Sequence, residues 1–90
     1  MSLTIRDARG QYVASGPAVR LLTQRAAIEP VAAVAVHVAG DGPALLSVTW
    51  LDGATGTCEW NDARACCDWL RGQAWARGRT RVYFPRGAQP

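Results

Sequence analysis

The middle third of the chain consists of three β-type segments separated by two turns, and this pattern restricts the fold more than any other feature of the sequence. Residues 31–39 are rich in valine, and Val34, Val36 and Val38 lie on the same face of an extended chain. A Gly-Asp-Gly-Pro turn leads into residues 44–51, and a loop that opens with Asp-Gly leads into residues 57–60. Strands joined by such short connections pair in antiparallel fashion. The sequence therefore predicts a three-stranded antiparallel meander.

Two strands and a helix are predicted before the meander. The segments Leu3–Arg6 and Tyr12–Ala14 are strand candidates, and the Asp-Ala-Arg-Gly turn between them favours a hairpin. Pro17 suits the first position of a helix because its missing N–H needs no partner there. The predicted helix covers residues 17–28. A strand is the alternative for this segment, because apolar residues also alternate along it.

A second helix and a last strand are predicted after the meander. Asn61 or Asp62 can cap a helix over residues 62–76. Apolar residues recur on one face of that helix at the spacing of a helical stripe, namely Ala63, Cys66, Cys67, Leu70 and Ala74. Gly72 lies on the opposite side, where it is expected to weaken the helix. Residues 80–84 are rich in β-forming side chains and predict a final strand.

These elements predict an α+β fold in the order β-β-α-β-β-β-α-β, with an antiparallel sheet and both helices packed on one of its faces. Ninety residues supply one hydrophobic core, so we expect a single domain over residues 1–86 and a tail at 87–90. The longest apolar run, residues 31–36, is far shorter than the roughly 20 residues that cross a bilayer. The N-terminal residues lack the cationic and apolar regions of a signal peptide, so none is expected.

The cysteines do not form the pattern of a disulfide framework or a zinc site. There are three, at positions 58, 66 and 67, and an odd number with two adjacent residues favours a reducing cytoplasm. With His37 they would supply four metal ligands, but adjacent helical residues point about 100° apart and no Cys-x-x-Cys pair is present. We therefore expect no metal and no cofactor, and thiols that pack as small apolar groups.

Catalytic patterns are also missing from the sequence. A Cys–His nucleophile needs an imidazole beside a thiol, whereas His37 lies among valines. Asp41 and Asp52 occupy turns, Asp62 occupies a cap position and Glu59 lies on a predicted strand. No pair of carboxylates has the spacing of a catalytic acid and base. Neither the phosphate-binding loop with Gly-Lys-Ser/Thr nor the Gly-x-Gly-x-x-Gly dinucleotide motif occurs. The sequence predicts a protein that is not an enzyme.

Charge is segregated along the chain. Residues 1–25 carry four arginines and one aspartate, residues 26–60 carry four carboxylates and no cation, and residues 61–90 carry six arginines and two aspartates. All ten cationic side chains are arginine, a bias typical of GC-rich genes and most simply of a bacterium or phage. Such blocks can give the molecule one basic and one acidic face, or they can mix once the chain folds.

The C-terminal third combines arginines with aromatic side chains, and we take the candidate binding residues from it. Arginine and tryptophan are enriched at the centres of protein interfaces, and the same groups can neutralise phosphates and stack on bases. On a helical wheel Trp75 has charged neighbours and is expected to be at least partly exposed, while the other tryptophans are expected in the core. The predicted partner-binding residues are Arg64, Asp68, Arg71, Trp75, Arg77, Arg79 and Arg81.

The sequence favours a small non-enzymatic protein-binding module that acts by covering the surface of another protein or complex. Inhibitors and accessory factors of phages and mobile elements, such as anti-CRISPR proteins, are examples of that class. The alternative is a nucleic-acid-binding accessory protein that uses the C-terminal arginines and aromatics, although a net charge of +3 is modest for that role. No membrane partner is expected. A homodimer is possible if a strand edge at Leu3–Arg6 or at 80–84 pairs with a second copy.

Overall fold

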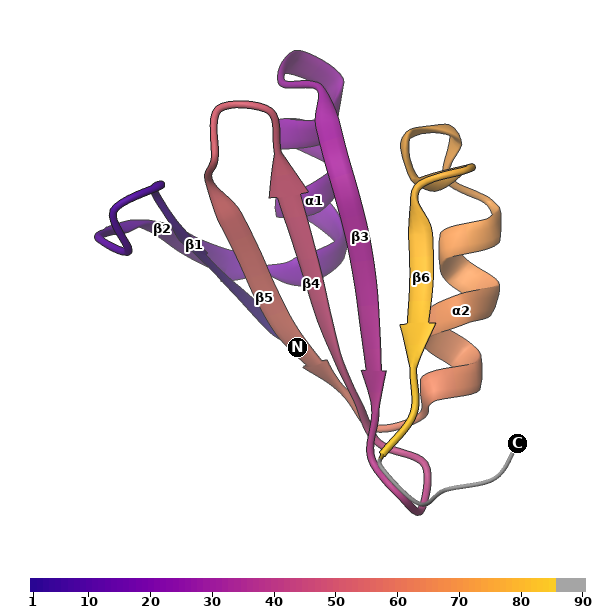
Figure 1. Cartoon of the computed structure of the whole chain (residues 1–90). Helices are drawn as coiled ribbons and strands as arrows, with labels where there is room; N and C mark the ends of the chain where they lie inside the picture. The colour runs from indigo at the N-terminus through magenta and orange to yellow at the C-terminus, as the bar shows by residue number, and fades with distance from the viewer. Residues whose placement is uncertain (86–90) are drawn as a thin grey trace.

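The structure, a computed structural model, describes residues 1–85 as one mixed sheet with helices packed against it (Figure 1). In chain order the elements are β1 (Ser2–Arg6), β2 (Tyr12–Pro17), α1 (Ala18–Ile28), β3 (Val31–Val38), β4 (Ala44–Trp50), β5 (Thr55–Trp60), α2 (Ala63–Arg71), a short 3-10 helix η1 (Ala74–Ala76) and β6 (Thr80–Tyr83). The strands lie in the order β2-β1-β5-β4-β3-β6. The tail expected at 87–90 lies outside the described residues.

The predicted α+β class and the order of helices and strands are confirmed, and β3, β4 and β5 form the predicted meander. The last strand differs from the prediction of a wholly antiparallel sheet. β6 pairs with β3 in parallel, with Val34 opposite Thr80 and Val36 opposite Val82. The cause is the connection through α2, which returns the chain to the end of the sheet where β5 begins. β5 already runs in the same direction as β3, so the strand that follows is parallel to both.

The first hairpin is longer than predicted and lies differently in the sheet. β2 continues to Pro17 because residues 15–17 pair with residues 2–4 of β1. The helix α1 then begins at Ala18, one residue later than expected, and the strand alternative for this segment is wrong. β1 is hydrogen-bonded to β2 on one side and to β5 on the other. The prediction of a free edge at Leu3–Arg6 is therefore also wrong, and β2 and β6 are the edge strands of the described sheet.

Both α-helices cover the same face of the sheet, as predicted, and the hydrophobic core lies between the two layers. The strand residues that face the helices are buried, and the largest of them are Leu3, Ile5, Val34, Val36, Leu46, Val48 and Trp50. Leu22 of α1 and Leu70 of α2 pack against them. Gly56 of β5 makes room for this packing, since a Cβ there would lie 3.2 Å from the Trp50 indole and 3.3 Å from Leu3.

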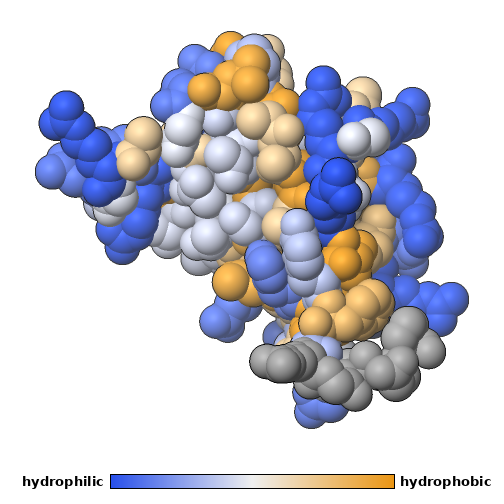
Figure 2. All heavy atoms as spheres, in the orientation of Figure 1, coloured by the Kyte–Doolittle hydropathy of each residue, from blue (hydrophilic) through white to orange (hydrophobic). Residues whose placement is uncertain are grey.

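The other face of the sheet is not covered by any helix of residues 1–85 and is turned toward the viewer in Figures 1 and 2. Cross-strand neighbours there are small or polar, with Thr4 opposite Thr57, Thr57 opposite Ser47, and Ser47 opposite Ala35. Figure 2 shows them as a pale area over the middle of the sheet. An antiparallel sheet of this composition can face water on one side. We call this surface the open face.

The predicted helix over residues 62–76 is wrong in its C-terminal part. Asp62 caps α2 as predicted, because its side-chain oxygen accepts a hydrogen bond of 2.9 Å from the backbone N–H of Arg64. The helix ends at Gly72, whose N–H donates to the Trp69 carbonyl at 3.1 Å. Glycine is a poor helix former, so it ends the helix here instead of only weakening it. A helical wheel therefore does not predict which side chains are exposed after residue 72.

Candidate functional site

The seven predicted binding residues lie on two different surfaces. Arg64, Asp68 and Arg71 are exposed along the outer side of α2. Arg77 is exposed in the turn that follows η1, and the other two arginines lie on or next to β6. The break after α2 separates these groups, so the single contact zone expected from a continuous helix is replaced by a helix flank and a sheet edge.

Alternation along β6 sends its side chains to opposite sides of the sheet. Tyr83 stacks on His37 of β3, with ring centroids 5.0 Å apart and planes 14° apart. His37 is exposed between the buried core residues of β3, which places this stacked pair on the open face. Arg81 has the phase of Tyr83 and projects on the same side. Arg79 lies in the turn before β6, where its Nη1 donates to the Arg77 carbonyl at 3.3 Å. Thr80 and Val82 have the opposite phase and face α2.

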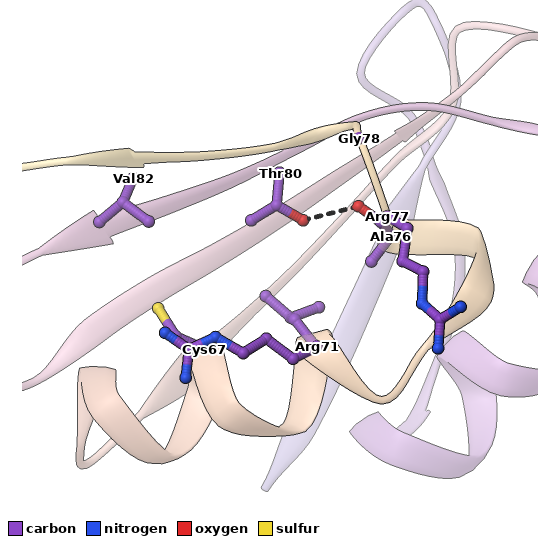
Figure 3. Close-up of a pocket in the computed structure, with 8 residues that line it drawn as sticks. Cys67, Arg71, Ala76, Arg77, Gly78, Thr80 and Val82 are labelled. Carbon is purple, nitrogen blue, oxygen red and sulfur yellow. Dashed lines mark hydrogen bonds between the residues drawn. The ribbon is translucent and has the colours of Figure 1, made fainter.

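A groove separates α2 from β6, and Figure 3 shows the residues that line it. Its deeper part is a cavity of about 330 Å³, within the range of small ligand sites. Cys67 and Arg71 project from the helix, Thr80 and Val82 project from the strand, and Arg77 lies at the closed end (Figure 3). The lining residues are Cys67, Leu70, Arg71, Ala76, Arg77, Gly78, Thr80 and Val82.

The groove continues toward the far end of β6 as a second hollow of about 370 Å³. Cys67, Arg71 and Val82 belong to both hollows, which makes them one continuous depression. The second hollow adds the side chains of Val38, Ala63, Arg64 and Phe84. We call the two together the α2–β6 groove, an apolar channel with arginines along its rim.

Local hydrogen bonds hold the turn that closes the groove. The Thr80 hydroxyl donates to the Ala76 carbonyl at 2.9 Å, and the Arg79 N–H donates to the same carbonyl at 3.1 Å. Gly78 has a φ of +73°, a left-handed conformation that other residues adopt only at a cost. These features fix the start of β6 relative to η1 and therefore fix the width of the groove.

The rim of the groove has an excess of positive charge. Arg71 forms a salt bridge with Asp68, with a distance of 2.7 Å between Nη1 and Oδ1, and both side chains are more than half exposed. Such an exposed pair contributes roughly 0–1 kcal/mol, so another carboxylate can replace Asp68 at little cost. Within residues 1–85, Arg64 and Arg77 have no salt-bridge partner. The rim therefore offers three guanidinium groups against one carboxylate.

Trp75 is partly exposed, but its indole also packs against other side chains of the fold. It is half-buried and contacts Trp69 edge-on at a centroid distance of 5.9 Å, and Trp69 packs against Trp60 at 5.7 Å. The Trp75 indole nitrogen is buried without a hydrogen-bond partner among the described residues. The expectation of partial exposure holds, but the row of three indoles attaches η1 to α2 and so positions Arg77. We therefore leave Trp75 out of the groove surface.

The cysteines are free thiols in two different environments. Cys58 and Cys66 are buried, and burial raises the pKa of both thiols, that of Cys66 to about 12. They are neutral packing groups at physiological pH. His37 lies on the opposite face of the sheet from Cys66, and no group of three or more possible metal ligands occurs within residues 1–85. Cys67 differs from the other two because it lines the groove.

Sequence reasoning did not identify the groove. It placed Cys67 on a buried stripe and treated residues 80–84 as one aromatic and basic segment, whereas Val82 and Phe84 line the groove and Tyr83 does not. The period of two along a strand was the available signal, because it separates the arginines from Thr80 and Val82. The partner of β6 in the sheet was not encoded in that local pattern.

Comparisons of the chain with protein-family models, with curated proteins and with solved structures give no match. None of the helices in residues 1–85 has the length and apolar character needed to span a membrane.

Proposed function

We propose that this chain is a non-enzymatic protein-binding module and that the α2–β6 groove is its binding surface. The observation that carries the proposal is the coincidence of an apolar groove, a basic rim and an edge strand at one end of the molecule. Binding would cover part of a partner protein or complex, as inhibitors and accessory factors of phages and mobile elements do. The cytoplasm is the compartment we propose, in keeping with the three free thiols.

The composition of the groove suits a protein partner. Its floor consists of small and medium apolar groups, and its rim consists of arginines, which are enriched in protein interfaces. Arg71 and Arg77 lie where an apolar anchor in the groove would exclude water from their guanidinium groups. Charged contacts that become dry in this way are the ones that carry binding energy.

The test uses affinity capture followed by titration. A tagged chain captures proteins from a bacterial lysate, and each captured protein is purified and titrated against the wild type and single variants. Arg71→Ala and Arg77→Ala should each raise the Kd about tenfold, which corresponds to about 1.4 kcal/mol. Arg20→Ala, on the exposed surface of α1, is the matched control and should leave the Kd unchanged. All variants should keep the melting temperature of the wild type.

Equal affinities for the groove variants and the Arg20→Ala control would move the binding surface elsewhere on the molecule. Loss of binding together with a lower melting temperature would show damage to the fold instead of loss of a contact.

A second candidate function is supported by the open face. Arg81 lies there beside the stacked rings of His37 and Tyr83, next to an uncovered sheet, and Arg79 lies in the turn that leads into this strand. Cations and rings on such a platform are suited to the phosphates and bases of single-stranded nucleic acid. A fluorescent oligonucleotide should then bind with an affinity that falls steeply with salt and that is lost in an Arg79→Ala/Arg81→Ala variant. No binding at low salt would exclude this function and leave the groove proposal intact.

A further inference from the structure

We propose that β6 accepts an extended, acidic segment of a partner protein as an added strand, with alternate apolar side chains in the α2–β6 groove. This inference rests on the proposed function and specifies the chemistry of the partner and its mode of binding. It combines three features at one place: a free strand edge, an apolar channel beside that edge, and arginines on both sides of it.

The free edge follows from the pairing of β6 with β3. The Val34 N–H donates to the Arg79 carbonyl at 3.1 Å, and Val34 stands opposite Thr80. In a parallel ladder, the backbone groups of alternate residues point to the same neighbour. The Arg79 carbonyl and both backbone groups of Arg81 are therefore directed toward β3, while Thr80 and Val82 direct their N–H and C=O groups away from it. Within residues 1–85 no strand pairs with β6 on that outer side.

An added strand at this edge would place every second side chain over the groove. The side chains of Thr80 and Val82 already face α2, and residues of an added strand in the same phase would point to the same side. There they would meet Cys67, Leu70 and the stems of the rim arginines. Main-chain pairing with pockets for alternate side chains is a general mode of peptide recognition. The residues of the added strand whose side chains point into the groove should accordingly be apolar and of medium size, as valine is.

Charge determines the other residues of the segment. The residues of the added strand whose side chains point to the open face would lie beside Arg81, where opposite charges across two strands stabilise pairing. The flanks of the segment would approach Arg64 and Arg71, which line the second hollow, and Arg77, which lies at the closed end of the first hollow. An incoming carboxylate can take the place of Asp68 on Arg71, since that salt bridge is exposed. Acidic residues at alternate positions therefore face Arg81 on the open face, and acidic residues at the ends of the segment reach the arginines of the groove rim.

A second copy of this chain is a poor occupant of the same edge. Antiparallel pairing of two β6 strands about Arg81 would place the two Arg81 side chains opposite each other, and like charges in that arrangement are destabilising. Arg79 and Arg77 would add to the repulsion. Charge complementarity therefore favours an acidic partner over self-association.

The experiment uses the full-length chain and a defined probe, a fluorescein-labelled heptapeptide of alternating glutamate and valine, followed by anisotropy. Two controls have the same length: an alternating lysine and valine peptide, and a peptide with the glutamates and valines in separate blocks. The alternating acidic peptide should bind at least tenfold more tightly than either control. Arg79→Ala/Arg81→Ala should weaken its binding, and Arg20→Ala should not.

Two further peptides test strand pairing itself. One carries N-methyl groups on its valines and the other on its glutamates, so that each lacks the N–H groups of one phase. A paired strand directs only one phase toward β6, so one methylated peptide should lose binding and the other should keep it. In hydrogen exchange followed by NMR, the peptide should protect the amides of Thr80 and Val82 and leave those of Arg81 and Tyr83 unchanged.

Equal effects of the two methylation patterns, or protection confined to the open face, would overturn strand addition. A dimer that persists in sedimentation at micromolar concentration, with its contact at Thr80 and Val82, would overturn it in favour of a second copy. If Arg71→Ala loses a captured partner while all peptides fail to bind, only this inference is overturned and the proposed function stands. If the peptide binds as described but no captured protein depends on Arg71 or Arg77, the proposed function of the groove is overturned instead.

Discussion

Gly56 and Trp50 show how closely single residues are fitted in this small core. A Cβ added to Gly56 would contact Trp50 and Leu3. Both side chains are essentially inaccessible to solvent and have little room to move. Overpacking of this kind costs about 1–3 kcal/mol, more than the about 0.4–1 kcal/mol gained by restricting a glycine in the unfolded chain. A side chain at this position should therefore destabilise the fold.

We predict that Gly56→Ala lowers the free energy of unfolding by about 1–2 kcal/mol, measured by urea denaturation. Gly40→Ala is the control, because no atom lies within 4 Å of its Cβ, and its effect should stay within about 0.5 kcal/mol. Similar midpoints for the two variants would show that the Trp50 indole can shift without cost.

Cys66 makes the free energy of unfolding depend on pH in the alkaline range. Burial, with smaller contributions from the Cys67 and Cys58 thiols, raises the pKa of Cys66 to about 12, whereas a thiol in the unfolded chain titrates near about 8.5. Above that lower value the unfolded chain loses a proton that the native chain keeps. The contribution of Cys66 is thus complete below about pH 8.5 and is lost as pH rises toward 12.

We predict that the free energy of unfolding of the wild type falls more steeply between pH 9 and 11 than that of Cys66→Ala, under reducing conditions. The difference in slope should approach about 1.4 kcal/mol per pH unit, since one proton is involved. Near neutral pH the variant will be less stable because it leaves a cavity, and this difference in the free energy of unfolding will shrink as pH rises. Parallel curves for the two proteins would show that the buried thiol does not control this dependence.

At the scale of the element, α2 is short and depends on its ends. Its first turn contains no acidic residue, and the Asp62 side chain supplies the only side-chain cap, on the N–H of Arg64. Loss of an aspartate cap costs about 0.5–2 kcal/mol. Because Arg64 and Cys67 follow within two turns, fraying at this end would also open the second hollow of the groove.

Asp62→Ala should therefore lower the free energy of unfolding by about 1 kcal/mol and speed the amide exchange of the first turn of α2. Asp41→Ala removes an exposed carboxylate that makes no side-chain hydrogen bond with residues 1–85, and it should change neither quantity by a comparable amount. A cap variant with wild-type stability and exchange would show that packing alone holds α2 in place.

The elements of this fold differ in how far local sequence predicts them. The meander is predictable because valine alternation and two glycine turns specify both the strands and their pairing. The cap of α2 is predictable because Asp62 precedes the apolar stripe. The break at Gly72 is not predictable, since the apolar stripe continues through Ala74 on a helical wheel, and only the packing of Trp75 on Trp69 shows where the chain turns.

At the scale of the whole molecule, charge that is segregated in sequence is only partly segregated in space. The arginines between residues 61 and 85 gather around α2 and β6, which gives one end of the sheet a basic character. Arg25, from the first basic block, instead pairs with Asp52 at 3.0 Å and lies over the Trp50 ring, so part of the N-terminal charge is neutralised. The charge blocks in the sequence predicted a positively charged surface. They did not predict how its arginines divide between the groove and the open face.

The position of β6 in the sheet also has no local signal. Whether it would join β5 or β3 depends on where α2 packs, and that is decided by contacts across the whole core. Parallel pairing with β3 makes it an edge strand and leaves the channel beside α2. The candidate site is therefore a product of topology, whereas the residues that compose it were visible in the sequence.

The buried residues of the described core all precede β6, the last of them being Ala76. The side chains of β6 therefore contribute little to the buried interior, although the strand supplies the edge and one wall of the groove. Exchange of its outward-facing residues can change which partner segment pairs with the edge while leaving the packing of the core intact.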